Sequence, residues 1–253
     1  MWVTFRALLA GAVRDRISLF WSVLAPLALL FGLGSLFPQP EYRRQLILGL
    51  LAFGSLGFAL SGTGFEVMRQ RTRGVYKLLR ATPFRIAAFV GALTCARGLI
   101  TLASVVVVAA AGAVVYRVDW SAWSIVLLLP VLITGTACFM LLGFLLGNLG
   151  DNENQVAMYN NLFLLPQLFA SEMFYSLAGA PGWVKAVSRL MPAHHFVEAM
   201  RAAVALDGAA LLSSLAVLLG MTLVALGLAV ATFQWDTGER LRPRFVALRR
   251  VRA

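Results

Sequence analysis

The sequence predicts an all-α, polytopic membrane protein with six transmembrane helices, and three observations carry this prediction. The 253-residue chain is 60% hydrophobic, with a mean hydropathy of +0.82. Long apolar runs recur along it, each near the roughly 20 residues that cross a bilayer. Lys and Arg concentrate in alternate connections between the runs. Because no water reaches the hydrocarbon core, each run must satisfy its own backbone groups and is predicted as a helix.

The connections between the runs are too short for an ordinary soluble domain, so residues 1–253 are predicted as a single transmembrane domain. With the N-terminus inside, the basic residues of segment 69–85 and of the tail 236–253 lie in the cytoplasm, in agreement with the positive-inside rule. Both termini are expected to be cytoplasmic. The predicted spans are residues 17–37, 45–65, 86–116, 123–147, 155–177 and 209–235.

The net charge of +11 would suggest a nucleic-acid partner in a soluble protein. Here the basic residues lie at the ends of the apolar runs, where anionic lipid headgroups attract them. Membrane lipids are therefore the expected partner, and nucleic acid is not. Cys95 and Cys138 both fall inside predicted spans, so we expect two free thiols rather than a disulfide.

The second predicted span is rich in glycine, which lets neighbouring helices approach closely. Close packing is the favoured interpretation, and a glycine-lined translocation path is the alternative. The glycines are Gly49, Gly54, Gly57, Gly62 and Gly64.

The N-terminal segment 1–16 is amphipathic at the helical period. Arg6 and Arg14 fall on one side. We expect a helix lying in the cytoplasmic interface, with a plain extension of the first span as the alternative. Its apolar side carries Trp2, Phe5, Leu9, Ala12 and Val13.

The connection 66–85 is the second amphipathic segment. If it is helical, its basic face comprises Arg69, Arg73, Lys77 and Arg80. Its opposite face comprises Met68, Val75, Leu78 and Leu79. Arg71 breaks this pattern, and Pro83 marks where a regular helix should stop or restart. Such a segment is either a topology signal or an element that docks into a groove of a partner.

The third amphipathic segment, 181–192, should lie at the outer interface. Its apolar positions are Trp183, Val184, Val187, Leu190 and Met191. Before it comes Glu172, which we expect to pair with Lys185 or Arg201 in preference to contacting a cationic substrate. For Arg97, snorkelling to the cytoplasmic interface is favoured over lining a path.

Two stretches resemble the type 2 permeases of ATP-binding-cassette exporters. The first is Glu66, Arg69, Arg73-Gly74 and Leu78-Leu79-Arg80-Ala81-Thr82-Pro83. The second is Asn160-Asn161-Leu162-Phe163-Leu164-Leu165-Pro166, followed by Pro181-Gly182-Trp183, by Met191-Pro192-Ala193-His194-His195 and by Met200-Arg201. The family often has Ser-Gly before an aromatic-Pro pair where this chain has Ser171-Glu172-Met173-Phe174-Tyr175. That departure bears on the substrate more than on the family.

The resemblance implies a cytoplasmic coupling helix in segment 66–85, braced by the N-terminal interfacial helix, and an outer re-entrant helix hairpin at 171–200. It implies a homodimer with two ATPase subunits in the bacterial inner membrane. The ATPase-coupling residues would be Glu66, Arg69, Arg73, Gly74, Lys77, Leu78, Leu79, Thr82 and Pro83. The outer gate or substrate path would comprise Phe163, Pro166, Phe169, Glu172, Phe174, Tyr175 and Trp183. On residue type alone, the aromatic members would equally form an interfacial belt.

The chain contains no Gly-x-x-x-x-Gly-Lys-Ser/Thr loop to hold phosphates. We therefore expect no catalytic residue and no cofactor in this chain, with ATP and Mg bound by the separate ATPase. The expected activity is export of a hydrophobic or amphipathic molecule, such as a drug or lipid. Export of a polysaccharide or lipid-linked glycan is the alternative within the class.

An intramembrane enzyme, such as a metalloprotease, is the alternative from another class, and a membrane scaffold without transport activity is a third. His194 and His195 with Glu198 would suggest metal, but His-Glu-x-x-His is absent and no third strong ligand is expected near them. No metal site is therefore predicted.

Overall fold

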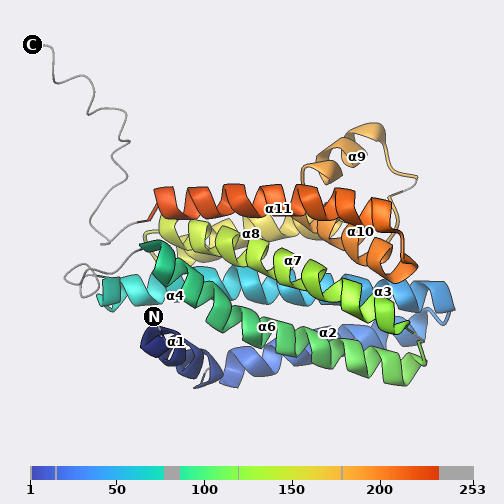
Figure 1. The fold of residues 1–253 in the computed structure, drawn as a ribbon, viewed down its shortest axis with the longest axis horizontal. Coiled ribbons are helices and arrows are strands. Elements are labelled where there is room, and N and C mark those ends of the chain that lie inside the picture. Colours follow the sequence, from blue (N-terminus) through green and yellow to red (C-terminus); the bar gives the residue numbers. More distant parts are fainter. Residues whose placement is uncertain (1, 15, 77–85, 119, 178, 234–253) are drawn as a thin grey trace, which may run out of the picture.

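The computed structural model describes residues 2–14, 16–76, 86–118, 120–177 and 179–233. Every regular element in these residues is a helix (Figure 1), which confirms the all-α class. The helices are α1 (Trp2–Arg14), α2 (Arg16–Leu36), α3 (Pro40–Gly54), η1 (Ser55–Ser61), α4 (Gly62–Thr72), α6 (Ile86–Tyr116), α7 (Ala122–Leu149), α8 (Glu153–Ala170), α9 (Gly182–Arg189), α10 (Pro192–Ala205) and α11 (Gly208–Ala231).

Five helices in the described residues are long and apolar enough to cross a membrane. Four of them match predicted spans closely. The fifth is the continuous run Pro40–Thr72, formed by α3, η1 and α4, which is much longer than the predicted span 45–65. The predicted span 155–177 corresponds to α8, which ends at Ala170 and is not among the five. The polar residues of α8 are Glu153, Asn154, Gln155, Asn160, Asn161 and Gln167.

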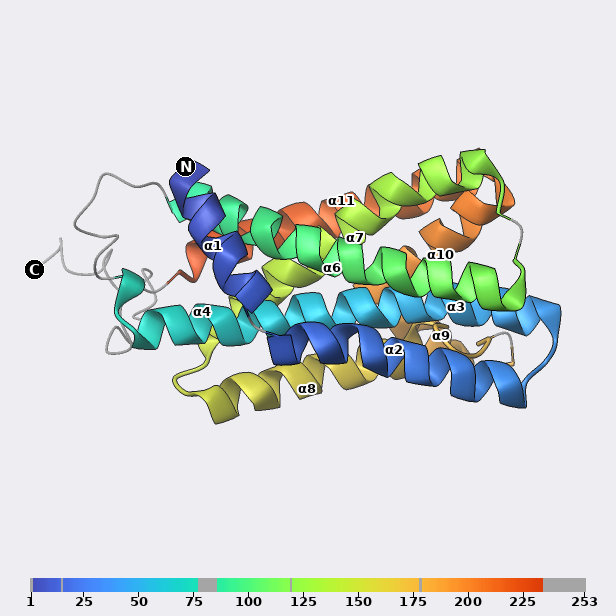
Figure 2. The same ribbon diagram turned by 90° about the horizontal axis from the view of Figure 1, so that it is seen from below.

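The long helices run side by side along one axis of the molecule, and α1 lies across one end against α6 (Figures 1 and 2). This end also holds the end of α4, the α7–α8 turn and the end of α11. We call it the basic end, because Arg6, Arg14, Arg69, Arg71 and Arg73 belong to its elements. The opposite end, which carries α9 and the start of α11, is called the hairpin end.

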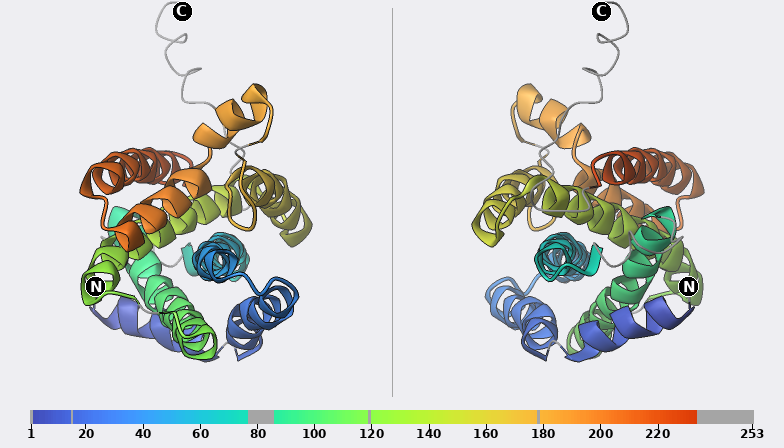
Figure 3. Two further views of the ribbon diagram at one scale, coloured as in Figure 1. Left: turned by 90° about the vertical axis from the view of Figure 1, so that its right-hand side faces the viewer. Right: turned by 90° about the vertical axis from the view of Figure 1, so that its left-hand side faces the viewer.

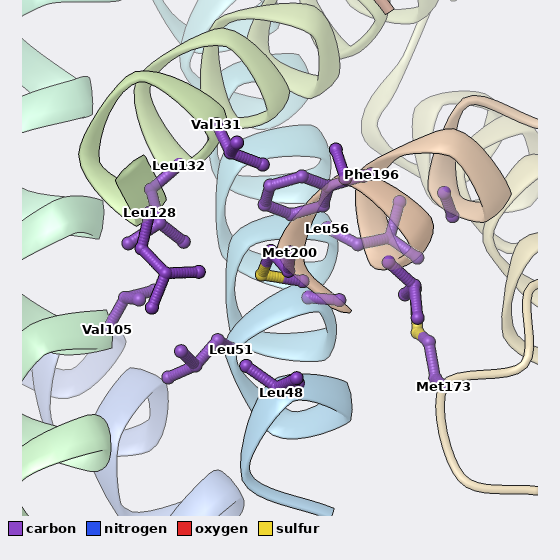
Figure 4. Packing of buried hydrophobic residues seen from close by; sticks show 14 of the residues in the cluster. Leu48, Leu51, Leu56, Val105, Leu128, Val131, Leu132, Met173, Phe196 and Met200 are labelled. Carbon is purple, nitrogen blue, oxygen red and sulfur yellow. The ribbon is translucent and has the colours of Figure 1, made fainter. Parts of the chain in front are cut away.

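The continuous helix α3–η1–α4 lies at the centre of the bundle. Views along the bundle axis show it between α2 and α8 (Figure 3), and it also contacts α6, α7 and α10. Its leucines are almost wholly buried and interlock with α7 and α10 (Figure 4). The residues involved include Leu48, Leu51, Leu56, Val131, Leu132, Phe196 and Met200. The core of the molecule is thus built around this helix.

A π-helical segment, η1, interrupts the central helix from Ser55 to Ser61. In a π-helix each backbone N–H bonds to the carbonyl five residues earlier, and such bulges often occur at functional sites. Gly54 and Gly62 flank the segment and Gly57 lies within it. The pattern of apolar residues gave no sign of this change in helical geometry.

The glycines of the predicted second span divide into two groups. A Cβ at Gly49 would collide with the carbonyl group of Met173, and a Cβ at Gly64 would lie 3.2 Å from the carbonyl oxygen of Gly143. These two glycines serve close packing, as the favoured interpretation predicted. Gly54, Gly57 and Gly62 instead line a cavity on the α2 side. The alternative interpretation, of a glycine-lined translocation path, stays a prediction for these three glycines.

The crossing of α7 and the central helix can be tested at Gly143. A Cβ there would lie 3.0 Å from Leu60 Cα and nearer still to the Leu60 carbonyl. We expect Gly143→Ala to destabilise the protein by roughly 1–3 kcal/mol, because the backbones must separate. The measurement is thermal unfolding of the purified protein in detergent.

Gly98→Ala on α6 is the matched control. The atom nearest to a Cβ at Gly98 would be Met140 Sδ at 3.8 Å, which is an ordinary van der Waals contact. Alanine favours a helix by about 1 kcal/mol over glycine, so the control should be neutral or stabilising. Equal melting of the two variants would contradict the proposed backbone contact.

Candidate functional site

An apolar cavity lies between α2 and the central helix, at the π-helical segment. Its volume is about 370 Å³. From α2 it is lined by Trp21, Ser22, Ala25 and Pro26, and from the central helix by Phe53, Gly54, Gly57, Phe58, Ser61, Gly62 and Phe65. A Cβ at Gly57 would have no heavy atom within 4 Å, so this glycine opens the cavity rather than packing a helix. We call this cavity the α2–η1 groove.

A partly buried ion-pair network lies beside the α2–η1 groove. Glu66 Oε2 accepts hydrogen bonds from Arg97 Nη2 at 2.8 Å and from Arg69 Nη2 at 2.7 Å. Gln70 Nε2 donates to the other carboxylate oxygen at 2.8 Å. A Cβ at Gly62, which lines the groove, would lie 3.0 Å from Arg97 Nη1. The network therefore ties α4 to α6 where the groove ends.

The favoured interpretation of Arg97, that it snorkels to the cytoplasmic interface, is wrong. Its side chain is 8% exposed and pairs with Glu66 inside the bundle. A charged group at membrane depth is costly unless it faces protein or water, and an internal carboxylate reduces that cost. The sequence does not indicate this pair, because 31 residues separate its members and only the packing of α4 on α6 brings them together.

The predicted coupling segment is not one continuous helix from Glu66 to Pro83. Helix α4 ends at Thr72, and Gly74 follows with φ +73, a conformation that glycine adopts at helix ends. Glu66 and Arg69 belong to the ion-pair network, whereas Arg73 is exposed at the helix terminus. The remaining predicted coupling residues, Lys77, Leu78, Leu79, Thr82 and Pro83, lie outside the described residues.

Arg71, which broke the basic-face pattern, points inward. Its side chain is buried and donates to the backbone carbonyls of Asn148, at 3.0 Å, and Gly150. These carbonyls belong to the end of α7, so Arg71 fastens the end of α4 to the α7–α8 turn. Arginine suits this position because its planar group presents several donors at once.

Tyr76 anchors the chain just beyond the α4 terminus. Its ring is wholly buried and packs against Phe89 and Phe233, with centroid distances of 5.4 and 5.1 Å. Burial raises the pKa of Tyr76 well above its ordinary value, so the phenol stays neutral. The chain is therefore anchored at Tyr76, where the described residues before α6 end.

At the hairpin end, Glu172 pairs with Arg201, one of the two partners expected for it. Arg201 Nη1 donates to Glu172 Oε2 at 2.6 Å, and Arg201 Nη2 donates to the Glu172 backbone carbonyl at 2.7 Å. Glu172 has φ 57, which turns the chain sharply after α8. The ion pair thus joins the end of α8 to α10.

The other residues assigned to an outer gate or path fall into two environments. Phe174 packs on Phe53 with centroids 5.9 Å apart, and Phe163 contacts the main core. Tyr175 donates to the backbone carbonyl of Phe169. Pro166, Phe169 and Tyr175 are exposed on or after α8, and Trp183 is exposed on α9. Phe53 connects this set to the α2–η1 groove, which it also lines.

Comparisons with known proteins agree with this architecture. A family model described as "ABC-2 type transporter" matches residues 1–205. A relative named "Putative transport permease YvfS", from Bacillus subtilis (strain 168), is 20% identical over 189 residues. That alignment covers 73% of this chain and 77% of the relative. The matched region contains the groove, the ion-pair network and helices α9 and α10.

Proposed function

The chain belongs to the ABC-2 type transporter family, as a membrane permease subunit, and we propose that it exports a hydrophobic or amphipathic molecule from the cytoplasm. The family membership implies an ABC ATPase as its partner. In the proposed complex, ATP and Mg are bound by that subunit, and this chain supplies the path. The observation that carries the substrate class is the α2–η1 groove.

The chemistry of the groove favours an apolar substrate portion. Four aromatic rings line it, from Trp21, Phe53, Phe58 and Phe65, whereas Ser22 and Ser61 supply the side-chain hydroxyls. Ligand sites of this kind are mostly apolar, with a few polar groups that fix orientation. Two hydroxyls offer little to a polysaccharide, whose many hydroxyl groups would need partners. A drug-like or lipid-like molecule fits this lining better.

The end of the groove supplies a charge as well. Arg97 lies next to Gly62 and is held by Glu66. An anionic headgroup approaching Arg97 would compete with Glu66, whereas a cationic one would be attracted by the carboxylate. The arrangement therefore suits an amphipathic molecule whose apolar portion occupies the groove.

We expect Gly57→Leu to block the groove. The Cβ of the new side chain would have no heavy atom within 4 Å, and its remaining atoms would extend into a cavity of about 370 Å³. Substrate-stimulated ATP hydrolysis by the reconstituted complex should require at least tenfold more substrate, which corresponds to about 1.4 kcal/mol. A panel of lipids and lipophilic cations and anions supplies the test compounds.

Gly220→Leu on α11 is the control for this experiment. Gly220 is exposed on a span, and a Cβ there also has no heavy atom within 4 Å. Both variants should assemble with the ATPase as the wild type does. If Gly57→Leu and Gly220→Leu respond alike to every stimulating compound, the groove is not the substrate site.

In the proposed orientation, the basic end faces the cytoplasm. Arg6, Arg14 and Arg73 are exposed there, and cytoplasmic loops of membrane proteins carry an excess of such residues. The sequence of the tail 236–253 adds further arginines after α11. The ATPase would then dock near the end of α4, and both termini would be cytoplasmic in a bacterial inner membrane.

We further propose that two permease copies assemble with two ATPase subunits. Helix α8 is polar for a membrane span, yet it also exposes Met158, Leu162, Leu165 and Phe169. Polar groups at membrane depth favour protein neighbours over lipid. A second copy against the face formed by α8 and the α2–η1 groove would cover this helix and enclose the path.

A further inference from the structure

We propose that the start of α10 holds a site for a divalent transition-metal ion, with Zn²⁺ as the best match, formed by His194, His195 and Glu198. One ligand atom from each residue lies within 4.8 Å of the others. These are the two histidines of the whole chain. Their convergence with a carboxylate gives three donors of the types that bind zinc.

The spacing of two donors already matches a zinc site. His194 Nε2 and Glu198 Oε2 are 3.5 Å apart. Ligands at about 2.0–2.1 Å from a tetrahedral zinc ion are separated by about 3.4 Å, so an ion fits between these atoms. The Glu198 side chain is 47% exposed, which leaves it room to turn toward the third donor. A water molecule would complete the tetrahedron.

Helix α9 orients both imidazole rings. The buried Ser188 hydroxyl lies 2.9 Å from His194 Nδ1, which leaves His194 Nε2 on the side of Glu198. His195 Nε2 donates to the Arg189 backbone carbonyl at 2.8 Å, because a carbonyl can only accept. With Nε2 engaged in this way, Nδ1 is the nitrogen that His195 can offer to an ion. Hydrogen bonds of this kind to the second ring nitrogen are a regular feature of histidine metal ligands.

The donor set also selects the ion. Two imidazoles and one carboxylate suit Zn²⁺, Cu²⁺ and Ni²⁺, whereas Mg²⁺ and Ca²⁺ prefer oxygen ligands. Because the ligands lie on α10 and their orienting groups on α9, a bound ion would hold these helices together. Arg201, which joins α10 to Glu172, follows Glu198 by three residues. Metal binding would therefore stiffen the hairpin end, whatever substrate the protein transports.

The test is equilibrium dialysis of the full chain, purified in detergent without a polyhistidine tag, against Zn²⁺. We expect one Zn²⁺ per chain, and no comparable binding of Mg²⁺ or Ca²⁺. His195→Gln and Glu198→Gln should each raise the Kd at least about tenfold, as loss of a ligand or its support does in known sites. The control is Glu153→Gln, an exposed carboxylate at the start of α8, which should bind as the wild type does.

Cu²⁺ provides a second readout that a purely structural effect would not change. Electron paramagnetic resonance of the Cu²⁺-loaded chain should show coupling to two imidazole nitrogens, and to one in His195→Gln. Glu198 is at the surface, so its variant keeps the test valid if His195→Gln fails to fold. Unchanged Zn²⁺ affinity in Glu198→Gln, or no stoichiometric binding by the wild type, would overturn the proposal.

Discussion

Glu66→Gln is expected to destabilise the protein by roughly 3 kcal/mol, since breaking a buried ion pair by removing one partner typically costs 3–5 kcal/mol. The Arg97 side chain is 8% exposed and lies 2.8 Å from the carboxylate, so the variant removes a charged partner from a mostly buried arginine. Glutamine keeps the size of the glutamate but replaces one acceptor oxygen by an NH2 group, which cannot accept the hydrogen bonds that Glu66 receives. The loss therefore reports on the charge together with an accepted hydrogen bond. Unfolding by SDS in mixed micelles, followed by tryptophan fluorescence, measures it.

Two companion variants separate the buried pair from its exposed neighbour. Arg69 also contacts Glu66, at 2.7 Å, but its side chain is 38% exposed. Arg69→Met should therefore cost less than about 1 kcal/mol, as for pairs near the surface. The double variant Glu66→Met with Arg97→Met should recover most of the stability, because methionines replace a desolvated ion pair. A Glu66→Gln protein as stable as Arg69→Met would show that the buried pair has no special role in stability.

If stability recovers in the double variant while transport does not, the pair has a second role. Arg97 lies beside Gly62, which lines the α2–η1 groove. Loss of transport in a stable protein would then place these charges on the substrate path. Transport equal to the wild type would instead mark the pair as a structural tie between α4 and α6.

The positions of the long helices could be predicted from hydrophobic runs, because burial in lipid imposes length and apolarity directly. Helix α8 shows where this signal weakens. Its asparagines and glutamines include Asn160 and Gln167, which are buried against other helices. The polarity of such a helix depends on its protein neighbours rather than on lipid. Hydropathy therefore identifies α8 as a membrane span less securely than it gives the position of α8 in the order of helices.

The roles of the glycines could not be assigned from sequence. Gly49 and Gly57 lie in the same apolar run, yet one touches the backbone of Met173 and the other opens a cavity. The difference depends on what lies opposite each position, and hence on the π-helical turn that rotates the later residues. Composition could predict close approach somewhere along the run. It could not say which glycines achieve it.

The pairing of a charged residue could be predicted best where it has few possible partners and these lie near it in space. Glu172 has Arg201 within reach across the turn after α8, and this pairing is confirmed. Arg71 was predicted only as an exception to a pattern, since its acceptors are backbone carbonyls at the end of α7. Backbone acceptors carry no residue-specific signal. An arginine that binds them looks in sequence like any other basic residue of a loop.

The second large effect is expected at the connection that follows α4. We propose that this connection docks on the ATPase, since it begins at the basic end with the exposed Arg73 and the anchored Tyr76. Arg73→Glu should weaken copurification of the ATPase strongly, because charge reversal at a complementary contact produces repulsion. The matched control is Arg44→Glu, an exposed arginine at the hairpin end, which should leave assembly unchanged.

Replacing Leu78 and Leu79 together by serine should have the larger effect on coupling. Each leucine contributes on the order of 1.5–3 kcal/mol if fully buried in the interface, so the double replacement removes most of the affinity of a small contact. Membrane insertion should persist, because the five helices of the described residues that are long and apolar enough to cross a membrane keep their sequence. The measurement compares copurified ATPase and transport-linked hydrolysis at equal amounts of permease in the membrane. If both the leucine and the Arg73 variants assemble and hydrolyse ATP normally, the basic residues of this connection only orient the protein in the membrane, and the ATPase must bind elsewhere on the basic end.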